Sequence, residues 1–323
     1  MTLKEISKVI LESNKIGLTF HTSPDGDAMG STLGLLNGLR ALGKDVYIVS
    51  REVIADNLSF LPLGEEVDGN TQEPSFDTDL VIVLDCGNRD RICADLDNYD
   101  GELINIDHHI TNEYYGTMNY VEPTSAATGE LVYLLLEELG FKFDSEDEIL
   151  QSIGMCLYTS LVTDTGSFRH SNVTQRTHKI AGDLISVGVN NTRIYNELFD
   201  NKPYEKVKLM GIALSSLELF LDGKVSFIKL SKKLLESLNL GNVDTSDIIS
   251  IALGIKNVEV AVVIKEVDDG VKGSLRSKAD FDVRKIAEAL GGGGHVKAAG
   301  FKLKDYSVDA AEKKIISEIE KEI

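Results

Sequence analysis

One segment near the N-terminus combines an imidazole with two carboxylates. His21 ends a short apolar run, and Asp25 and Asp27 follow it in a turn that holds Gly26 and Gly30. Glycines give such a turn the backbone freedom it needs. A P-D-G sequence alone more often marks a turn with an aspartate helix cap. With an imidazole four residues upstream, however, the two carboxylates could also hold neighbouring metal ions.

Further acids and histidines stand where other apolar runs end. Asp85 follows a run typical of a buried strand, and Asp107, His108 and His109 follow another. Asp164 ends an apolar helical run, which is also compatible with a plain helix end before a glycine turn. Mixed carboxylate and imidazole ligation suits manganese, ahead of zinc, iron or magnesium. Together with the first segment, these residues predict a metal site.

Predicted strands and helices alternate along the chain, and these elements must position the acids and histidines. Short apolar runs predict buried parallel strands at 17–20, 46–49, 80–84 and 103–106. Helical spacing of apolar residues predicts helices at 3–13, 33–42, 128–139, 146–161 and 174–187. This alternation predicts an α/β domain with a doubly wound parallel sheet, in which ligands bind beyond the carboxyl ends of the strands. The acids and histidines would then meet at one edge.

With 323 residues, the chain is long enough for two domains. We expect a domain that holds the metal site at 1–187, a connector at 188–201 and a smaller α/β domain at 202–323. In the last part, strands are expected near 225–230, 258–265 and 271–276, and helices near 283–290 and 308–319. An apolar helix face in the connector could support a homodimer.

The composition indicates which binding partners and which cell compartment to expect. The net charge of −19 disfavours long nucleic acids, whose binding requires many neutralised phosphates, but it permits a small anion beside local cations. Three cysteines without a C-x-x-C pair fit the reducing cytoplasm. No signal peptide is expected, and no apolar run approaches the roughly 20 residues that cross a membrane. The sequence has neither a Walker-type phosphate loop nor a G-x-S-x-G elbow.

These segments, in this order, resemble the DHH phosphoesterase family, named for the Asp-His-His motif that is here Asp107-His108-His109. The resemblance extends to the C-terminal half. The stretch from Gly291 to Gly300, GGGGHVKAAG, is similar to the glycine-rich signature of the DHH-associated C-terminal domain, and the stretch 271–277 is similar to the strand before it. The resemblance therefore covers nearly the whole chain.

The resemblance implies a centre with two divalent metal ions, with Mn²⁺ as the expected occupant. One ion would be held by His21, Asp25 and Asp85, and the other by Asp27, Asp85, His108 and Asp164, so that Asp85 bridges the two. The implied catalytic residues are His109, which would face the substrate phosphate, and Asp107, which would orient the histidines. At these positions the sequence does not depart from the family pattern.

The two-domain arrangement resembles the nanoRNases of this family. These enzymes hydrolyse short RNA and dinucleotides such as pApA or pGpG, and remove a phosphate from the adenosine bisphosphate pAp. The resemblance implies substrate binding by Arg276, Ser277, His295 and the glycines Gly292, Gly293 and Gly294, whose amides could form an anion site. Arg91, or its neighbour Arg89, could reach the scissile phosphate. Two alternatives stay open: a phosphodiesterase for cyclic dinucleotides such as c-di-AMP, and a silent nucleotide-binding module.

Overall fold

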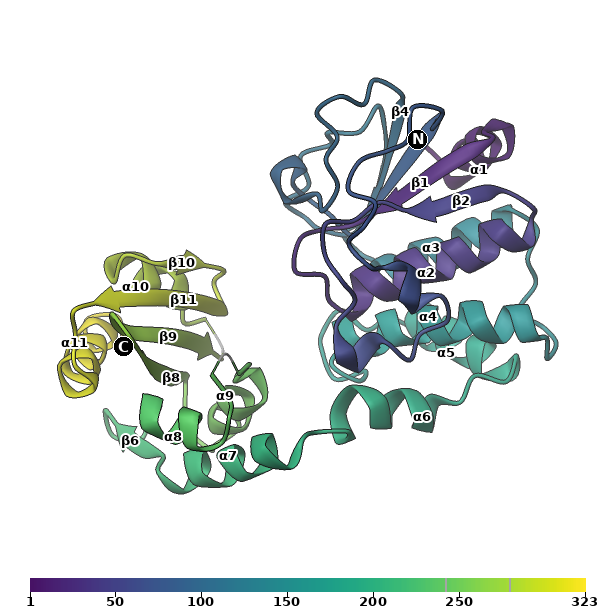
Figure 1. Cartoon of the computed structure of the whole chain (residues 1–323). Coiled ribbons are helices and arrows are strands. Elements are labelled where there is room, and N and C mark those ends of the chain that lie inside the picture. Colours follow the sequence, from purple (N-terminus) through teal and green to yellow (C-terminus); the bar gives the residue numbers. More distant parts are fainter. Residues whose placement is uncertain (242, 279) are drawn as a thin grey trace. The chain divides into compact units, whose positions relative to one another are not determined.

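The chain folds into two compact units, Met1–Asn201 and Lys202–Ile323 (Figure 1). The computed structural model describes residues 1–241, 243–278 and 280–323. Residues 188–201, expected as a connector, belong to the first unit. They form helix α6 (Asn191–Tyr195) and a π-helical turn (Asn196–Asp200), and Val189 and Ile194 are buried in the first unit's core.

A five-stranded parallel sheet forms the centre of the first unit. Its strands are β1 (Lys15–Thr19), β2 (Asp45–Ile48), β3 (Leu80–Leu84), β4 (Glu102–Asp107) and β5 (Met118–Val121), in the spatial order β2-β1-β3-β4-β5. The chain runs outward from β1 to β2 and then crosses back to β3 on the other side of β1. This reversal is the switch point at which doubly wound sheets bind ligands. The predicted parallel sheet is confirmed, and β5 is an additional strand at its edge.

Helices cover one face of this sheet. Helices α2 (Gly26–Ala41) and α3 (Thr128–Glu138) contact the strands, and α1 (Leu3–Glu12) packs beside α3. Helices α4 (Glu148–Asp164) and α5 (Gln175–Ser186) form a further layer on these. Short 3-10 turns lie at Asp56–Leu58, Gly64–Glu66 and Arg89–Arg91. Thr2 begins α1 with a capping box, in which its hydroxyl accepts from the Glu5 amide and the Glu5 carboxylate accepts from the Thr2 amide. Across the described residues of both units, every helix is too short or too polar to cross a membrane.

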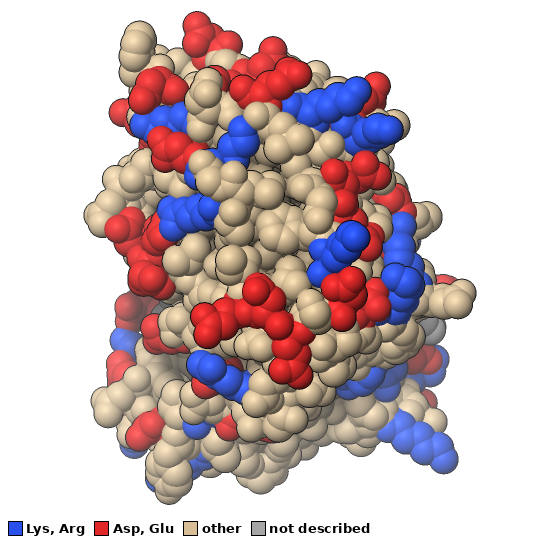
Figure 2. All heavy atoms as spheres, turned by 90° about the vertical axis from the view of Figure 1, so that its right-hand side faces the viewer, with Lys and Arg blue, Asp and Glu red and all other residues tan. Residues whose placement is uncertain are grey.

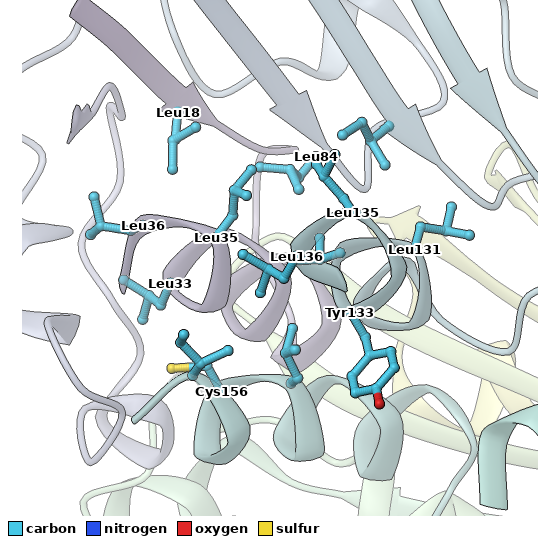
Figure 3. Close-up of a cluster of buried hydrophobic side chains, with 14 of the residues drawn as sticks. Leu18, Leu33, Leu35, Leu36, Leu84, Leu131, Tyr133, Leu135, Leu136 and Cys156 are labelled. Carbon is cyan, nitrogen blue, oxygen red and sulfur yellow. The ribbon is translucent and has the colours of Figure 1, made fainter. Parts of the chain in front are cut away.

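The core of the first unit is layered. Leu18 and Leu84 point from the strands onto α2 and α3, which lie side by side, and α4 packs beneath these two helices (Figure 3). On the opposite face, Val81 and Val83 pack under the segment from Cys86 to Leu96. Burying each such side chain contributes roughly 1.5–3 kcal/mol. Both faces of the sheet are therefore covered.

The second unit is a six-stranded sheet between two helical layers. Its strands are β6 (Glu218–Phe220), β7 (Val225–Leu230), β8 (Val260–Val267), β9 (Gly270–Ser277), β10 (Gly293–Gly294) and β11 (Ala298–Lys304), in the order β10-β11-β9-β8-β7-β6. Its helices are α7 (Tyr204–Ser215), α8 (Lys232–Ser237), α9 (Ser246–Leu253), α10 (Val283–Ala289) and α11 (Val308–Glu320). One core lies under α10 and α11, the other under α7, α8 and α9. This is the predicted smaller α/β unit.

Candidate metal centre

Three strand ends carry the central residues of the site. Asp107 is the last residue of β4, Asp85 follows β3 directly, and His21 lies two residues beyond β1. Asp85 takes a left-handed backbone conformation, with φ at 55°. Aspartate tolerates this region better than most residues, and such backbone strain concentrates at functional sites. The turn directs the Asp85 side chain into the space between His21 and His108.

Asp25 serves as a helix cap and still lies near His21. Its Oδ1 accepts hydrogen bonds from the backbone amides of Asp27 (3.0 Å) and Ala28 (3.1 Å), which begins α2. The same oxygen lies 3.9 Å from His21 Nε2. The two interpretations of the P-D-G turn are therefore compatible, because the cap fixes the carboxylate beside the imidazole.

Two clusters of donor atoms share Asp85. On one side, His21 Nε2 lies 3.5 Å from Asp85 Oδ2. On the other side, His108 Nε2 lies 3.6 Å from Asp85 Oδ1, 3.6 Å from Asp27 Oδ2 and 3.4 Å from Asp164 Oδ2. The structure thus brings together His21, Asp25, Asp27, Asp85, His108 and Asp164, which the sequence placed on separate segments.

The spacing of these atoms fits divalent cations. Two ligands that each lie about 2.1 Å from one cation are about 3–3.5 Å apart, which is close to the separations found here. A third group of donors joins Asp85, His108 and His109. Because each oxygen of Asp85 faces a different histidine, its carboxylate lies where a ligand shared by two ions would lie.

The hydrogen bonds at Nδ1 of two histidines also suit metal binding. His21 Nδ1 lies 2.9 Å from the Thr22 carbonyl oxygen, and His108 Nδ1 lies 3.2 Å from the Ser125 carbonyl oxygen. A carbonyl oxygen only accepts, so each Nδ1 carries a hydrogen and each Nε2 is left facing the carboxylates, where it would bind a metal after losing any proton of its own. This arrangement holds the tautomer that binds a metal through Nε2.

The carboxylates repel one another. Asp27 is fully buried, and burial together with the nearby charges of Asp85 and Asp164 raises its pKa well above the usual value. Burial likewise raises the pKa of Asp164 to about 6, although His108 opposes the shift. Burial lowers the pKa of His21, but hydrogen bonds to Asp25 and Asp85 outweigh it and raise that pKa to about 10. A divalent cation between these groups would relieve the repulsion.

Asp27 is held by groups that the sequence analysis did not identify. Its Oδ2 accepts from the Thr128 amide (2.8 Å), and its Oδ1 accepts from the Gly129 amide (3.1 Å), at the N-terminus of α3. The hydroxyls of Ser31 (2.9 Å) and Ser160 (2.6 Å) also donate to Oδ1. Ser31 lies four residues after Asp27 on the same helix, but the other three partners lie more than a hundred positions away, so the local sequence carries no signal for them.

Asp107 orients His109 and not His108. The Nδ1–H of His109 donates to Asp107 Oδ1 at 2.7 Å, and the Asn112 amide group donates to Asp107 Oδ2 at 2.6 Å. The hydrogen bond to Asp107 raises the pKa of His109 to about 9, so Nε2 also carries a proton at neutral pH. The expectation that Asp107 orients both histidines is therefore wrong for His108, which the Ser125 carbonyl holds instead. Asn112 could have been suspected, because it follows the motif by three residues.

The remaining expected residues are distributed over both units. Arg91 is exposed and its Nη2 lies 3.3 Å from His21 Nδ1, whereas its neighbour Arg89 donates through its amide to Glu113. In the second unit, Arg276 is half-buried and the Ser277 hydroxyl donates to the Phe281 carbonyl oxygen at 2.7 Å. The Ser277 side chain thus closes the loop that leads to α10.

The glycine loop is only partly available to an anion. Gly293 and Gly294 pair with Gly300 and Ala299 of β11, and His295 is exposed. The Gly292 amide, however, donates to the Ala287 carbonyl oxygen at the end of α10 (2.8 Å). An anion site made of all three glycine amides does not fit this arrangement, because the helix end already uses the first of them.

Models of two known families match parts of the two units. Residues 15–161 match the DHH family, N-terminal domain, and residues 229–323 match the DHHA1 domain. A protein of Thermus thermophilus, named as a bifunctional oligoribonuclease and PAP phosphatase, is 33% identical over 95% of this chain and 90% of its own length. The chain belongs to the DHH family. It is a metal-dependent phosphoesterase, as DHH phosphoesterases are.

Two further proteins are similar over almost the full length. The Bacillus subtilis protein with the same name is 32% identical and covers 98% of this chain and 97% of its own. The crystal structure of an exopolyphosphatase-related protein from Bacteroides fragilis superposes with a TM-score of 0.89 at 27% identity, covering 99% of this chain and 95% of that one. The similarity therefore extends over both units.

Proposed function

We propose that this DHH phosphoesterase hydrolyses short oligoribonucleotides, including dinucleotides, to mononucleotides, and that it also dephosphorylates pAp. The observation that carries the proposal is the similarity to two named oligoribonuclease and PAP phosphatase proteins, which spans 95% and 98% of the chain and so includes both units. The three free, buried cysteines are consistent with an enzyme that is located in the reducing cytoplasm.

In this proposal two divalent ions, expected to be Mn²⁺, occupy the candidate centre. His21, Asp25 and Asp85 would hold one of them. Asp27, Asp85, His108 and Asp164 would hold the other. When bound, such ions activate water and neutralise charge on a phosphoryl oxygen. The separations of 3.4–3.6 Å between His108 Nε2 and three carboxylate oxygens support this assignment.

His109 would act on the substrate itself. Its Nδ1 is fixed by Asp107, and its side chain is 41% exposed, so its protonated Nε2 is accessible to a ligand. A donor in this position can stabilise a phosphoryl oxygen or give its proton to the departing oxygen. Arg91, exposed beside His21, would add a second cation for the phosphate.

Short substrates also fit the charge of the protein. On the face shown in Figure 2, lysines and arginines are interspersed with aspartates and glutamates, and no continuous basic tract crosses it. A long nucleic acid needs such a tract. In the second unit, Arg276 and His295 would hold part of the nucleotide beside Gly293 and Gly294. Ser277 would position the neighbouring loop.

The test is turnover with Mn²⁺ on pApA, longer RNA, pAp and c-di-AMP side by side. We expect pApA and pAp to be hydrolysed, and longer RNA to be a poorer substrate. Faster cleavage of c-di-AMP than of pApA would replace this proposal with the cyclic-dinucleotide alternative. Nucleotide binding without any turnover would favour a silent binding module.

Asp85→Asn tests the centre, because it keeps the size of the side chain and removes the charge shared by both clusters. We expect turnover to fall at least about a hundredfold, with the circular dichroism spectrum unchanged. Asp77→Asn is the matched control, because Asp77 is exposed and pairs only with Lys15 and Ser75 in the described structure. Full activity of Asp85→Asn would contradict the assignment.

A further inference from the structure

A pocket in the first unit has aromatic walls. Its volume is about 290 Å³, and it lies between helix α4, the turn that follows Asp164 and helix α6. Tyr158 of α4, Phe168 of the turn and Tyr195 of α6 supply its rings. All the residues that line it belong to the first unit, so the pocket is complete within that unit.

The pocket and the candidate metal centre lie on opposite sides of α4. Asp164 belongs to the metal centre, and Ser160, one helical turn earlier, donates to Asp27. Tyr158 and Val162 are also one turn apart, and both line the pocket. Because an α-helix has about 3.6 residues per turn, positions two apart point to nearly opposite sides. The pocket is therefore separate from the metal centre.

A strained turn holds Phe168 at the pocket. Gly166, Ser167 and Phe168 have successive φ angles of 54°, 59° and 61°, all in the left-handed region. Residues other than glycine rarely adopt this conformation, and such strain concentrates at functional sites. The Phe168 amide donates to the Thr165 hydroxyl at 2.9 Å, and the Phe168 ring stacks on His178 with the ring centroids 5.4 Å apart. The fold therefore fixes this ring in spite of the conformational cost.

The polar groups of the pocket are neutral and available to a ligand. None of the described residues that line it is charged. Within the part of the chain that the structure describes, no partner hydrogen-bonds to the hydroxyls of Ser167 and Thr192 or to the side-chain amide of Asn196. A hydroxyl and an amide can each donate and accept. The pocket thus combines aromatic rings with a few uncharged hydrogen-bonding groups.

These properties match a nucleobase. A base is planar and uncharged, its faces stack on aromatic side chains, and its edge carries donors and acceptors. A phosphate or a carboxylate would find no cation in the described lining, and an aliphatic ligand would leave the polar groups of Thr192 and Asn196 without partners. The volume is near the lower end for small-molecule sites, which suits a ligand as small as a nucleoside.

We propose that this pocket binds a nucleoside, with the base against the rings of Phe168 and Tyr195 and the base edge at Asn196. Tyr195 is 46% exposed, so its ring is accessible to a ligand. Phe199 supports that ring, with the two ring centroids 5.0 Å apart. The inference goes beyond the proposed function, because a ligand in this pocket lies away from the metal centre and needs no phosphate.

The experiment is calorimetric titration of the full chain with adenosine in the presence of Mn²⁺. Adenosine carries no phosphate ester, so the enzyme cannot hydrolyse it. We expect saturable binding to the wild-type protein. Tyr195→Ala should weaken this binding about tenfold or more, as expected for one lost stacking contact, whereas Tyr195→Phe keeps the ring and should bind as the wild type does. Asn196→Ala should also weaken binding, so the proposal is tested even if Tyr195→Ala fails to fold.

Tyr204→Ala is the matched control, because Tyr204 is an exposed tyrosine that does not line the pocket. It should bind adenosine as the wild type does. The proposal is overturned if adenosine does not bind, or if Tyr195→Ala and Asn196→Ala bind it as tightly as the wild type. Indole that binds as tightly as adenosine would overturn the assignment to a nucleoside, because indole offers a ring with a single N–H. A dimer that Tyr195→Ala dissociates, without any adenosine binding, would overturn the proposal and assign the pocket to a second copy of the chain.

Discussion

Arg176 is the origin of a series of contacts that ends at His108. Its guanidinium donates to Glu130 Oε2 (2.9 Å), Glu122 Oε1 (2.7 Å) and the Ser125 hydroxyl (2.6 Å). The carbonyl oxygen of Ser125 accepts the Nδ1–H of His108. Glu130 is fully buried, and Arg176 is the cation that pairs with its carboxylate. Arg176 thus holds in place both the loop from Glu122 to Ser125 and the imidazole of His108.

Replacing this arginine tests its role as a positioning residue. Arg176→Met leaves Glu130 buried without a cation, so we expect the free energy of unfolding to fall by about 3 kcal/mol. The loosened Ser125 carbonyl should weaken Mn²⁺ binding at His108 about tenfold or more, as measured by calorimetry.

Two comparisons interpret the Arg176 result. Lys179→Met breaks the exposed Lys179–Asp183 pair and should cost at most about 1 kcal/mol without changing Mn²⁺ affinity. If Arg176→Met loses stability but binds Mn²⁺ as the wild type does, the arginine supports the fold and does not position His108.

At the scale of residues, the sequence predicted the candidate metal ligands better than the residues that hold those ligands in place. Asp85 and Asp107 could be placed because each follows an apolar strand, and parallel strands end at one edge. Ser160 and Arg176 could not, since a mid-helix serine and an arginine near a helix start are ordinary surface patterns. Their roles depend on how α4 and α5 pack, and the local sequence does not encode that.

At the scale of elements, the close approach of α2 and α4 positions Asp27. A Cβ at Gly30 would meet the Cys156 carbonyl oxygen and lie 2.8 Å from the Ser160 backbone nitrogen. The missing side chain lets the two helices touch, and this contact brings the Ser160 hydroxyl within 2.6 Å of Asp27. One glycine therefore connects helix packing to the metal centre.

Gly30→Ala should push the two helices apart. We expect a loss of about 2 kcal/mol in stability, from overpacking against backbone, together with weaker Mn²⁺ binding. The measurement is chemical denaturation followed by circular dichroism. Gly182→Ala in α5 is the control, because an added Cβ there meets nothing within 4 Å. It should be neutral or stabilise by up to about 1 kcal/mol. Equal stability of the two variants would refute the packing argument.

The elements themselves could be predicted where periodicity was clear. The apolar run Leu80–Leu84 is a strand with the predicted bounds, and α3 and α5 end within one residue of expectation. Strands β5 and β11 were not predicted. All four residues of β5 are half-buried, and the small residues that begin β11 hide its alternation, so neither gives a period-two signal.

At the scale of the whole molecule, the metal-free protein carries an electrostatic cost that depends on pH. The pKa of Asp164 is raised to about 6 and that of His21 to about 10. Each group is more protonated in the folded chain than in the unfolded chain between its unfolded and folded pKa values. Stability therefore falls as pH rises through these windows, first for Asp164 and then, above about pH 6.5, for His21.

Bound divalent ions should remove this electrostatic cost, and they should stabilise the folded protein more at higher pH. Metal ligands bind in their deprotonated forms, so Mn²⁺ competes with fewer protons as pH rises. We predict that the difference in Tm between Mn²⁺ and EDTA samples is larger at about pH 8 than at about pH 6. Asp85→Asn should lose most of this difference at both values, because its carboxylate lies between the two clusters. A Tm difference that is independent of pH, or that survives in Asp85→Asn, would place the stabilising ions elsewhere on this acidic protein.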